Sequence, residues 1–267
     1  INNIWGKAYS RFTIGLVDLE RGQFSLAIQH LRQTMQDSKQ AKFMGGELMS
    51  RSFLAVVYAE IGATSLALKT VEEVQENELP IIRTFFVGAN MLIHARANDI
   101  PRAEKLIEMY DQKLKNVYFV ARHYFILGKC YHYLAKEDYP AAVKTATDFL
   151  ASLNKNGIKY INAELMQLMG LAHIALEDPQ KAKQIFREGI QLAEQLGSPK
   201  SLWQLHYHLG KLHETLGETA PAEKHFHQSK EYVDYILQNL FEDDLRNIFL
   251  ARDEVKFLFS KQIQAES

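Results

Sequence analysis

The chain carries one pattern of small and large apolar residues six times. The pattern starts from alanines that recur with gaps of 40, 36, 39, 40 and 40 residues, at Ala27, Ala67, Ala103, Ala142, Ala182 and Ala222. In five copies a large apolar residue follows four positions later, and these residues are Leu31, Val71, Ile107, Phe186 and Phe226. Four residues span about one helical turn, so the small and large side chains share one face of a helix. The pattern predicts six helices that neighbouring helices approach closely.

A second pattern, Leu-Gly-x-x-Tyr or a near variant, precedes the alanines and predicts a partner for each helix. Its copies are Ile14-Gly15, Leu54-Ala55 to Tyr58, Leu127-Gly128 to Tyr131, Met169-Gly170 to His173 and Leu209-Gly210 to His213. A glycine in mid-helix costs about 1 kcal/mol relative to alanine, and it is tolerated where two helices cross too closely for a side chain. The predicted unit is therefore a pair of helices with a tight crossing.

Glycines and prolines mark the ends of the predicted helices. Gly22, Gly62 and Gly217 lie between the two patterns, where a left-handed residue ends a helix. Every proline falls at a predicted helix start: Pro101, Pro140, Pro179 and Pro221 begin second helices, and Pro80 and Pro199 precede first helices. The predicted caps of the second helices are Asp99, Asp138, Asp178 and Thr219.

The succession of Leu-Gly-x-x-Tyr, turn glycine and Ala-x-x-x-Phe resembles the tetratricopeptide repeat over residues 8 to 236, in six copies. The resemblance implies an all-α fold, a right-handed α-α superhelix of about six helix pairs with a C-terminal capping helix. Residues 1–240 then form the repeats, and residues 241–267 form the capping helix and tail. The mean spacing of 39 residues exceeds the family's usual value of about 34, which implies longer helices.

Two copies depart from the pattern. The third has Asn90 and Met91 where Leu-Gly is expected. In the fourth, Ala146 takes the place of the large residue, so we expect Val143 and Phe149 to supply the bulk. HEAT-type repeats share the longer period but do not supply this pairing of glycine and alanine, so they rank second.

The regular spacing breaks after the sixth helix pair. Residues Glu242 to Phe259 predict an acidic helix start followed by an apolar stripe, and every solenoid needs a terminal helix to cover its last repeat. Residues Asp244 to Leu258 also resemble the closing segment of tetratricopeptide regions in large bacterial signalling proteins, through Leu-Arg-x-x-Phe-Leu and a short Glu-Val helix. That resemblance implies a relation to STAND-type ATPases related to the maltose regulon activator and to nucleotide cyclases with repeat tails.

Charge and composition narrow the class of partner. The 31 basic and 32 acidic residues give a net charge of −1, which provides no field to hold nucleic acid or an anionic membrane. The single cysteine, Cys130, is typical of a reducing compartment, and we expect it to be a buried small side chain. The apolar stretch from Ile81 to Ile93 falls short of the roughly 20 residues of a membrane span. With no signal peptide visible and a start at Ile1, we expect a fragment of a larger cytoplasmic protein.

No motif for catalysis emerges. Gly45-Gly46 and Gly62 lack the Gly-Lys-Ser/Thr of a phosphate-binding loop, and neither Gly-x-Ser-x-Gly nor Cys-x-x-Cys occurs. His213-Glu214 lacks the second histidine of a zinc-protease helix. An enzyme is therefore disfavoured, and we expect no cofactor.

The ten histidines invite a metal hypothesis, but their spacing argues against it. His94, His173 and His213 occupy the tyrosine position of the repeat, and His206 occupies another aromatic position, so they are expected to pack in the interior. His225 and His227, which come two residues apart, diverge by about 200° on a helix. The histidines are therefore predicted to be structural or exposed.

In the resembling family the first helices line a concave wall, which makes their outward side chains the candidates for partner binding. The first two repeats present a mainly apolar wall of Tyr9, Phe12, Leu16, Leu19, Met49, Ser52, Val56 and Ala59. Later repeats contribute the predicted site residues Phe125, Lys129, Tyr133, Gln167, Gln204, Tyr207 and Lys211. Lys129 and Lys211 occupy equivalent positions beside aromatic residues, which suits an extended peptide or an acidic group.

These observations favour a non-catalytic interaction or effector-sensing module of a bacterial signalling or transcription-regulatory protein. In the first hypothesis, a protein partner or small effector binds the concave face and shifts the parent protein between states. The alternative is a peptide receptor of the tetratricopeptide pheromone-sensor kind. Other domains of the parent chain could also cover this face, and the apolar wall could mediate self-association.

Overall fold

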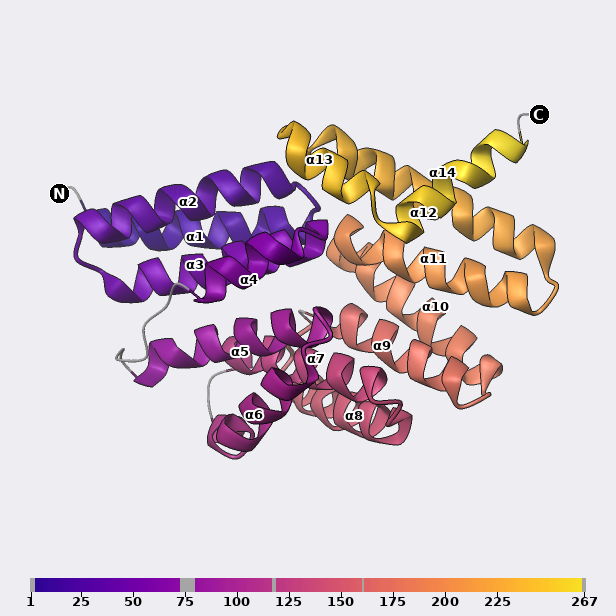
Figure 1. Cartoon of the computed structure of the whole chain (residues 1–267), viewed down its shortest axis with the longest axis horizontal. Coiled ribbons are helices and arrows are strands. Elements are labelled where there is room, and N and C mark those ends of the chain that lie inside the picture. The colour runs from indigo at the N-terminus through magenta and orange to yellow at the C-terminus, as the bar shows by residue number, and fades with distance from the viewer. Residues whose placement is uncertain (1–2, 73–79, 117–118, 160, 266–267) are drawn as a thin grey trace. The chain divides into compact units, whose positions relative to one another are not determined.

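The computed structural model describes residues 3–72, 80–116, 119–159 and 161–265, and every regular element in these ranges is a helix. The expected all-α helical repeat fold is thus confirmed. Figure 1 shows antiparallel helix pairs joined by short turns, such as α3 with α4 in one unit and α11 with α12 in the other. No helix in the described ranges has the length and apolar character needed to cross a bilayer.

The chain divides into two compact units, each described here by itself. The first comprises Ile1–Leu19 and Phe24–Glu137, and the second comprises Glu20–Gln23 and Asp138–Ser267. The helices that begin in the first unit are α1 (Ile4–Glu20), α2 (Phe24–Gln40), α3 (Met44–Ile61), α4 (Thr64–Glu72), α5 (Pro80–Arg96), α6 (Ile100–Tyr110), the 3-10 helix η1 (Lys113–Asn116) and α7 (Phe119–Ala135). Those of the second are α8 (Tyr139–Lys155), α9 (Asn162–Ala175), α10 (Pro179–Leu196), α11 (Pro199–Thr215), α12 (Thr219–Gln238), α13 (Asp243–Leu250) and α14 (Asp253–Ala265).

The recurring alanines all lie in the interior. Each of the six is buried, as are the large residues of the first, second, fifth and sixth copies. The third copy differs from the prediction, because Leu106 is buried and Ile107 is only half-buried. In the fourth copy Phe149 is buried as expected, whereas Val143 is half-buried.

The glycines of the first helices allow the predicted tight crossings. A Cβ on Gly210 would lie 2.7 Å from Cδ1 of Phe226, and one on Gly170 would overlap the ring of Phe186. The large residue of the second helix thus occupies the space that the glycine leaves. Gly128 acts differently, since a Cβ there would lie 2.7 Å from the carbonyl carbon of Met91 in α5. At this crossing the backbones of α5 and α7 approach each other directly.

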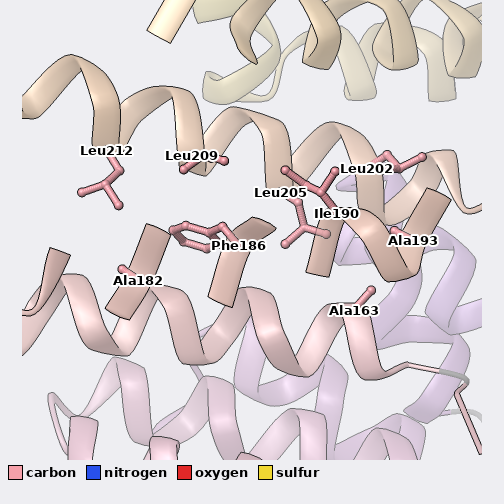
Figure 2. Close-up of a cluster of buried hydrophobic side chains, with 9 residues drawn as sticks. All are labelled: Ala163, Ala182, Phe186, Ile190, Ala193, Leu202, Leu205, Leu209 and Leu212. Atoms are coloured by element: carbon pink, nitrogen blue, oxygen red, sulfur yellow. The ribbon is translucent and has the colours of Figure 1, made fainter. Parts of the chain in front are cut away.

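Figure 2 shows the resulting core of the second unit between α9, α10 and α11. Its buried members are Ala163, Ala182, Phe186, Ile190, Ala193, Leu202, Leu205, Leu209 and Leu212. Burying a side chain such as leucine or phenylalanine contributes about 1.5–3 kcal/mol, so this layer is a main source of stability for the unit.

Three of the four predicted caps are confirmed. Asp99, Asp138 and Asp178 each accept a hydrogen bond from the backbone N–H three residues later. Thr219 is not a cap, because α12 already begins at Thr219. The preceding Glu218 makes no cap bond either, and its carboxylate instead accepts hydrogen bonds from Lys183 and pairs with His213.

The turn glycines have the predicted left-handed conformation. Gly22, Gly62 and Gly217 have φ angles of 68°, 95° and 74°. At the corresponding turns of three other copies, Asn98, Glu137 and Glu177 adopt φ angles near 58° without being glycine. Short helix-ending turns therefore recur even where the sequence gives no glycine signal.

The tail forms two helices rather than one continuous helix. The helix α13 ends at Leu250 and α14 starts at Asp253, with Ala251 and Arg252 between them. Phe249 of α13 is fully buried and lies edge-on to Trp203 at a ring-centroid distance of 5.9 Å.

Candidate partner-binding surfaces

The predicted site residues of the first unit are mostly occupied by contacts within that unit. Phe125 is only 1% exposed and belongs to the core, so it offers no free surface and the prediction for it is corrected. Lys129 is largely buried, and its Nζ donates to Oδ1 of Asp111 at 2.6 Å. The same Nζ lies 5.9 Å from the ring centroid of the half-buried Tyr133. The acidic partner expected for this lysine is thus already supplied by the end of α6.

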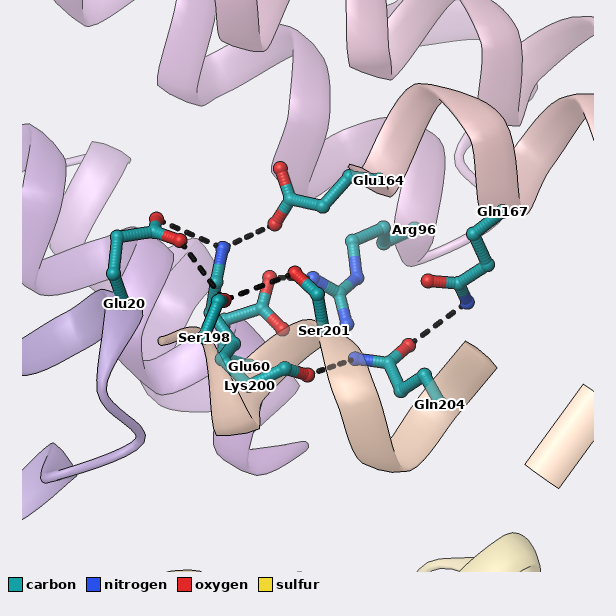
Figure 3. Close-up of polar contacts among 9 residues, drawn as sticks. All are labelled: Glu20, Glu60, Arg96, Glu164, Gln167, Ser198, Lys200, Ser201 and Gln204. Atoms are coloured by element: carbon teal, nitrogen blue, oxygen red, sulfur yellow. Dashed lines mark hydrogen bonds and ion pairs between the residues drawn. The ribbon is translucent and has the colours of Figure 1, made fainter. Parts of the chain in front are cut away.

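In the second unit, two predicted residues bind each other. Nε2 of Gln167 in α9 donates to Oε1 of Gln204 in α11 at 3.0 Å (Figure 3). Gln167 is buried, and Gln204 also donates to the carbonyl of Lys200 at 3.4 Å. These amides join one repeat to the next instead of facing a groove.

A buried lysine lies one turn before this amide pair. Lys200 at the start of α11 is almost fully buried, and its Nζ pairs with Glu164 and lies 3.1 Å from Oε1 of Glu20, both within the second unit. Figure 3 shows the ammonium group between the two carboxylates. A buried lysine is retained only when its charge is matched, so this network is expected to hold the register of α9 against α11. Sequence reasoning missed Lys200 because nothing in its spacing distinguishes it from a surface lysine.

The last two predicted residues, Tyr207 and Lys211, lie beneath the tail. The ring of Phe257 in α14 packs edge-on to Tyr207 at 5.8 Å, and Nζ of Lys211 lies 4.5 Å from the centroid of the same ring. Lys211 also donates to Oε2 of Glu214 at 2.6 Å. The prediction of an open cation and aromatic site is therefore corrected, because Phe257 of α14 already contacts both residues, although the Lys211 side chain stays 40% exposed.

Two of these corrections, those for Gln167 and Tyr207, share a physical cause. Gln167 and Tyr207 each lie three residues before the glycine of their helix, and this side of a first helix faces the next helix in the stack. The residues that looked outward-facing within one helix pair are thus used for packing between pairs. Only the arrangement of successive pairs reveals this.

An accessible apolar pocket lies instead at the start of the first unit. This shallow hollow, the Tyr9 pocket, is partly open to solvent and is lined by Ala8, Tyr9, Phe12, Thr34, Phe43, Gly46 and Met49. Tyr9, Phe12 and Met49 belong to the predicted apolar wall, whereas Phe43 was not predicted. Ser52, Val56 and Ala59 of that wall are buried because α3 packs against α2, α4 and α5, and Leu19 of α1 is buried as well.

Exposed aromatic side chains border this pocket. Trp5 stacks on Phe43 at a centroid distance of 4.1 Å and remains 54% exposed. Tyr9 is 63% exposed, and Met44 is half exposed. The glycine at position 46 makes the arrangement feasible, since a Cβ there would lie 2.6 Å from Cδ1 of Phe43. The sequence signal is the pair Gly45-Gly46, which only Met44 separates from Phe43.

The charges near the pocket are predominantly basic. The acidic side chains there are already paired, Asp37 with Arg11, and Glu47 with Arg51 at 3.2 Å and Lys39 at 3.3 Å. Two further basic side chains are exposed, Lys7 on α1 and Lys42 on the turn between α2 and α3. Residues 3–12 and 34–51, which contain every residue that lines the pocket, thus carry five basic and two acidic side chains.

The histidines of the second unit form a stacked group. Nδ1 of His206 and Nδ1 of His225 are 2.9 Å apart, and His225 stacks on His213 with a centroid distance of 5.5 Å. Burial lowers the pKa of both His206 and His225 to about 4, and neighbouring positive charges act in the same direction. His227 is exposed, as predicted. Among the described residues there is no group of three or more His, Cys, Asp or Glu side chains that could hold a metal ion.

Cys130 is buried in α7, as predicted. Its burial raises the pKa of the thiol to about 12, which keeps the thiol protonated at neutral pH. Since the thiolate is the nucleophilic form, this side chain is suited to packing and not to reaction.

Comparison with known proteins supports the repeat assignment. Residues 163–196, which include most of α9 and all of α10, match the tetratricopeptide repeat family model. The crystal structure of BtubC (BKLC) from P. vanneervenii is similar, with a TM-score of 0.50 and 13% sequence identity, covering 85% of this chain and 93% of that chain. At this identity the similarity concerns the fold alone. No curated protein matches the chain.

Proposed function

We propose that this chain is a non-catalytic protein-interaction module, and that the Tyr9 pocket of its first unit holds one apolar side chain of a protein or peptide partner. The observation that carries the proposal is the pocket lined by Tyr9, Phe12, Phe43 and Met49 with exposed Trp5 beside it. Aromatic and methionine side chains are enriched at protein interfaces because they bury large apolar areas. Scaffolds built from helical repeats commonly serve as contact surfaces.

The shape of the pocket and the charges around it restrict the kind of partner that fits. The pocket is a shallow apolar hollow that is partly open to solvent, so it offers contact to one apolar side chain and not an enclosed site for a whole cofactor. The basic side chains around it favour a segment in which acidic residues flank the apolar anchor. The partner expected is therefore an acidic peptide segment with one large apolar residue.

The wider role that we propose is regulatory. The tail resembles those of bacterial signalling proteins, and this resemblance supports a module that reports partner binding within a larger cytoplasmic protein. A peptide receptor of the pheromone-sensor kind is the alternative. It requires a ligand that extends along several helices and contacts residues such as Lys129 and Tyr133.

Peptide display against the purified chain tests the proposal. We expect enriched peptides with one large apolar residue among acidic ones, and Met49→Gln to weaken their binding at least about tenfold, the effect of losing about 1.4 kcal/mol. Met109→Gln is the matched control, because Met109 is exposed on α6 outside the pocket lining. Binding that resists Met49→Gln and Tyr9→Ala would disprove the pocket. Binding that weakens only with Lys129→Ala would favour the extended-peptide receptor.

A further inference from the structure

The second unit carries a segment of the kind that the Tyr9 pocket is expected to bind. Phe241 lies between α12 and α13 and is 64% exposed. Three acidic residues follow it directly, Glu242, Asp243 and Asp244. Of these, Asp243 and Asp244 are exposed in the first turn of α13. The segment thus presents one large apolar side chain beside acidic groups.

The stability of α13 explains the acidic residues but not the exposed phenylalanine. Carboxylates in the first turn of a helix interact favourably with the helix dipole, so Asp243 and Asp244 stabilise α13. Phe241 keeps most of its surface in contact with solvent, whereas only 2% of the preceding Leu240 is exposed. Aromatic side chains are enriched in protein interfaces, so Phe241 is suited to anchor a contact with another molecule.

Other exposed apolar residues that precede acidic ones fit the pocket less well. Leu176 is 41% exposed, but the carboxylate of the nearby Asp178 already caps α10. Leu216 is 38% exposed, and the nearby Glu218 already accepts hydrogen bonds from a lysine of α10. Compared with these two segments, the Phe241 segment has an aromatic and more exposed anchor and a longer run of acidic residues.

The Tyr9 pocket offers the complementary groups. Tyr9 is itself 63% exposed, so its ring is accessible to an incoming aromatic side chain. Lys7 and Lys42 are exposed, and each directly precedes a residue that lines the pocket. Basic groups beside an apolar hollow match acidic groups beside an apolar anchor, and such complementarity favours specific association.

We propose that Phe241 of one copy of this chain docks in the Tyr9 pocket of a second copy, with Asp243 and Asp244 facing the basic side chains around the pocket. This inference rests on the proposed function, because it names the partner of the same pocket. The two contacting surfaces differ, so the association is head-to-tail. A contact centred on one phenylalanine is small, and interfaces below about 1,200 Å² are weak. The dissociation constant expected is about 10 μM to 1 mM.

Two variants that each remove one side of the contact test the inference. Phe241→Ser removes the anchor and leaves the pocket, whereas Tyr9→Ala with Met49→Gln removes the pocket and leaves the anchor. In sedimentation equilibrium the mass of the unmodified chain should rise with concentration, and each variant alone should stay monomeric up to about 1 mM. An equal mixture of the two variants should form a one-to-one dimer. Self-association through one shared surface gives no such recovery on mixing.

The matched control for the anchor is Leu176→Ser. Leu176 is also exposed and is followed by Glu177 and Asp178. This variant should associate as the unmodified chain does. Equal loss of association in Leu176→Ser and Phe241→Ser contradicts a specific role for Phe241.

Charge reversal around the pocket provides a second measurement that leaves the apolar lining unchanged. In the Phe241→Ser chain, adding Lys7→Glu with Lys42→Glu should weaken the mixed dimer at least about tenfold. The control pair is Lys105→Glu with Lys155→Glu, at exposed positions of α6 and α8, which should leave the affinity unchanged. A mixed dimer that is equally weakened by both pairs contradicts docking at the Tyr9 pocket.

The outcomes separate this inference from the proposed function. Peptide display on the Phe241→Ser chain measures the pocket alone. If acidic peptides bind through the pocket but the two variants do not dimerise on mixing, the inference is wrong and the proposed function stands. If neither the peptides nor a second copy bind the pocket, both are wrong. An unmodified chain that stays monomeric up to about 1 mM also overturns the inference.

Discussion

Gly128 lies where two helix backbones come within reach of a single methyl group. A Cβ at this position would be 2.7 Å from the carbonyl carbon of Met91 and 2.8 Å from the nitrogen of Leu92. Backbone atoms of a packed helix cannot rotate away as a side-chain end can, so α5 and α7 would have to separate.

We therefore expect Gly128→Ala to destabilise the chain by about 2–3 kcal/mol in urea unfolding, although alanine gains up to about 1 kcal/mol of helix propensity. Gly6→Ala is the control, because the atoms nearest to its Cβ belong to the side chain of Asn3 near the chain start. The control should lie within about 0.5 kcal/mol of the unmodified chain. If both substitutions changed the free energy of unfolding similarly, helix propensity, and not the close approach of α5 and α7, would determine the effect of Gly128→Ala.

The stacked histidines make stability depend on pH. The pKa values of His206 and His225 are about 4 in the folded chain, below the value of about 6.5 expected in the unfolded chain. The unfolded chain therefore binds more protons between these values, so the contribution is present above pH of about 6.5 and is lost as the pH falls towards 4.

Thermal unfolding near pH 7 and near pH 5 should show a lower midpoint at the acidic value, by at least about 3 °C for a loss of 1 kcal/mol. A His206→Leu/His225→Leu double variant should have a smaller pH effect, since no imidazole remains to be protonated there. The control His227→Leu replaces an exposed histidine and should keep the full effect. An undiminished pH effect in the double variant would assign it to other groups.

Sequence alone predicted much at the residue scale. The mid-helix glycines, the turn glycines and the buried alanines follow from local spacing, because each needs only one helix pair. The role of Lys200 does not follow, since its burial depends on Glu164, which lies 36 residues away in the preceding first helix.

At the scale of the elements, the helix caps also show that local spacing does not reveal contacts with other helices. Asp99, Asp138 and Asp178 were predicted correctly as caps, whereas Thr219 was not. The sixth copy places Glu218 at the cap position, and its longer side chain reaches His213 and Lys183 instead of the first turn of α12.

This difference predicts that Asp178→Ala costs about 1 kcal/mol, the usual effect of losing a side-chain cap. Thr219→Ala should change the free energy of unfolding by less than about 0.5 kcal/mol, because Thr219 is already a helical residue. Chemical denaturation of the two variants measures both values. A loss for Thr219→Ala as large as that for Asp178→Ala would mean that Thr219 does cap α12 in solution.

The partner face was the least predictable feature among the elements. Within one helix pair, Gln167 and Tyr207 point away from their second helix and look free. In the structure the first is covered by Gln204 and the second by Phe257. Solvent exposure in a repeat protein depends on the following repeat, so a pattern read within one repeat assigns packing residues to the surface.

At the scale of the whole molecule, the stacking of repeats means that a substitution destabilises mainly the helices around it. In a solenoid each repeat contacts mainly its neighbours, so stability is a sum of repeat and interface contributions. Phe186 fills the core between α9, α10 and α11 of the second unit, and Phe53 lies buried in α3 of the first. Each of the two units thus has its own buried residues. The division into repeats over residues 1–240 and a tail over residues 241–267 remains a prediction.

Phe186→Ala should cost about 3–5 kcal/mol and accelerate amide exchange most in α9, α10 and α11. Phe53→Ala, a matched deletion in the other unit, should act most strongly in α1, α3 and α7, because the Phe53 ring contacts Phe12 of α1 and Tyr124 of α7. Hydrogen exchange read by mass spectrometry resolves the two regions in one experiment. If either substitution accelerated exchange uniformly along the chain, the repeats would unfold as one cooperative body, because an opening that starts in any layer would then have to include all of them.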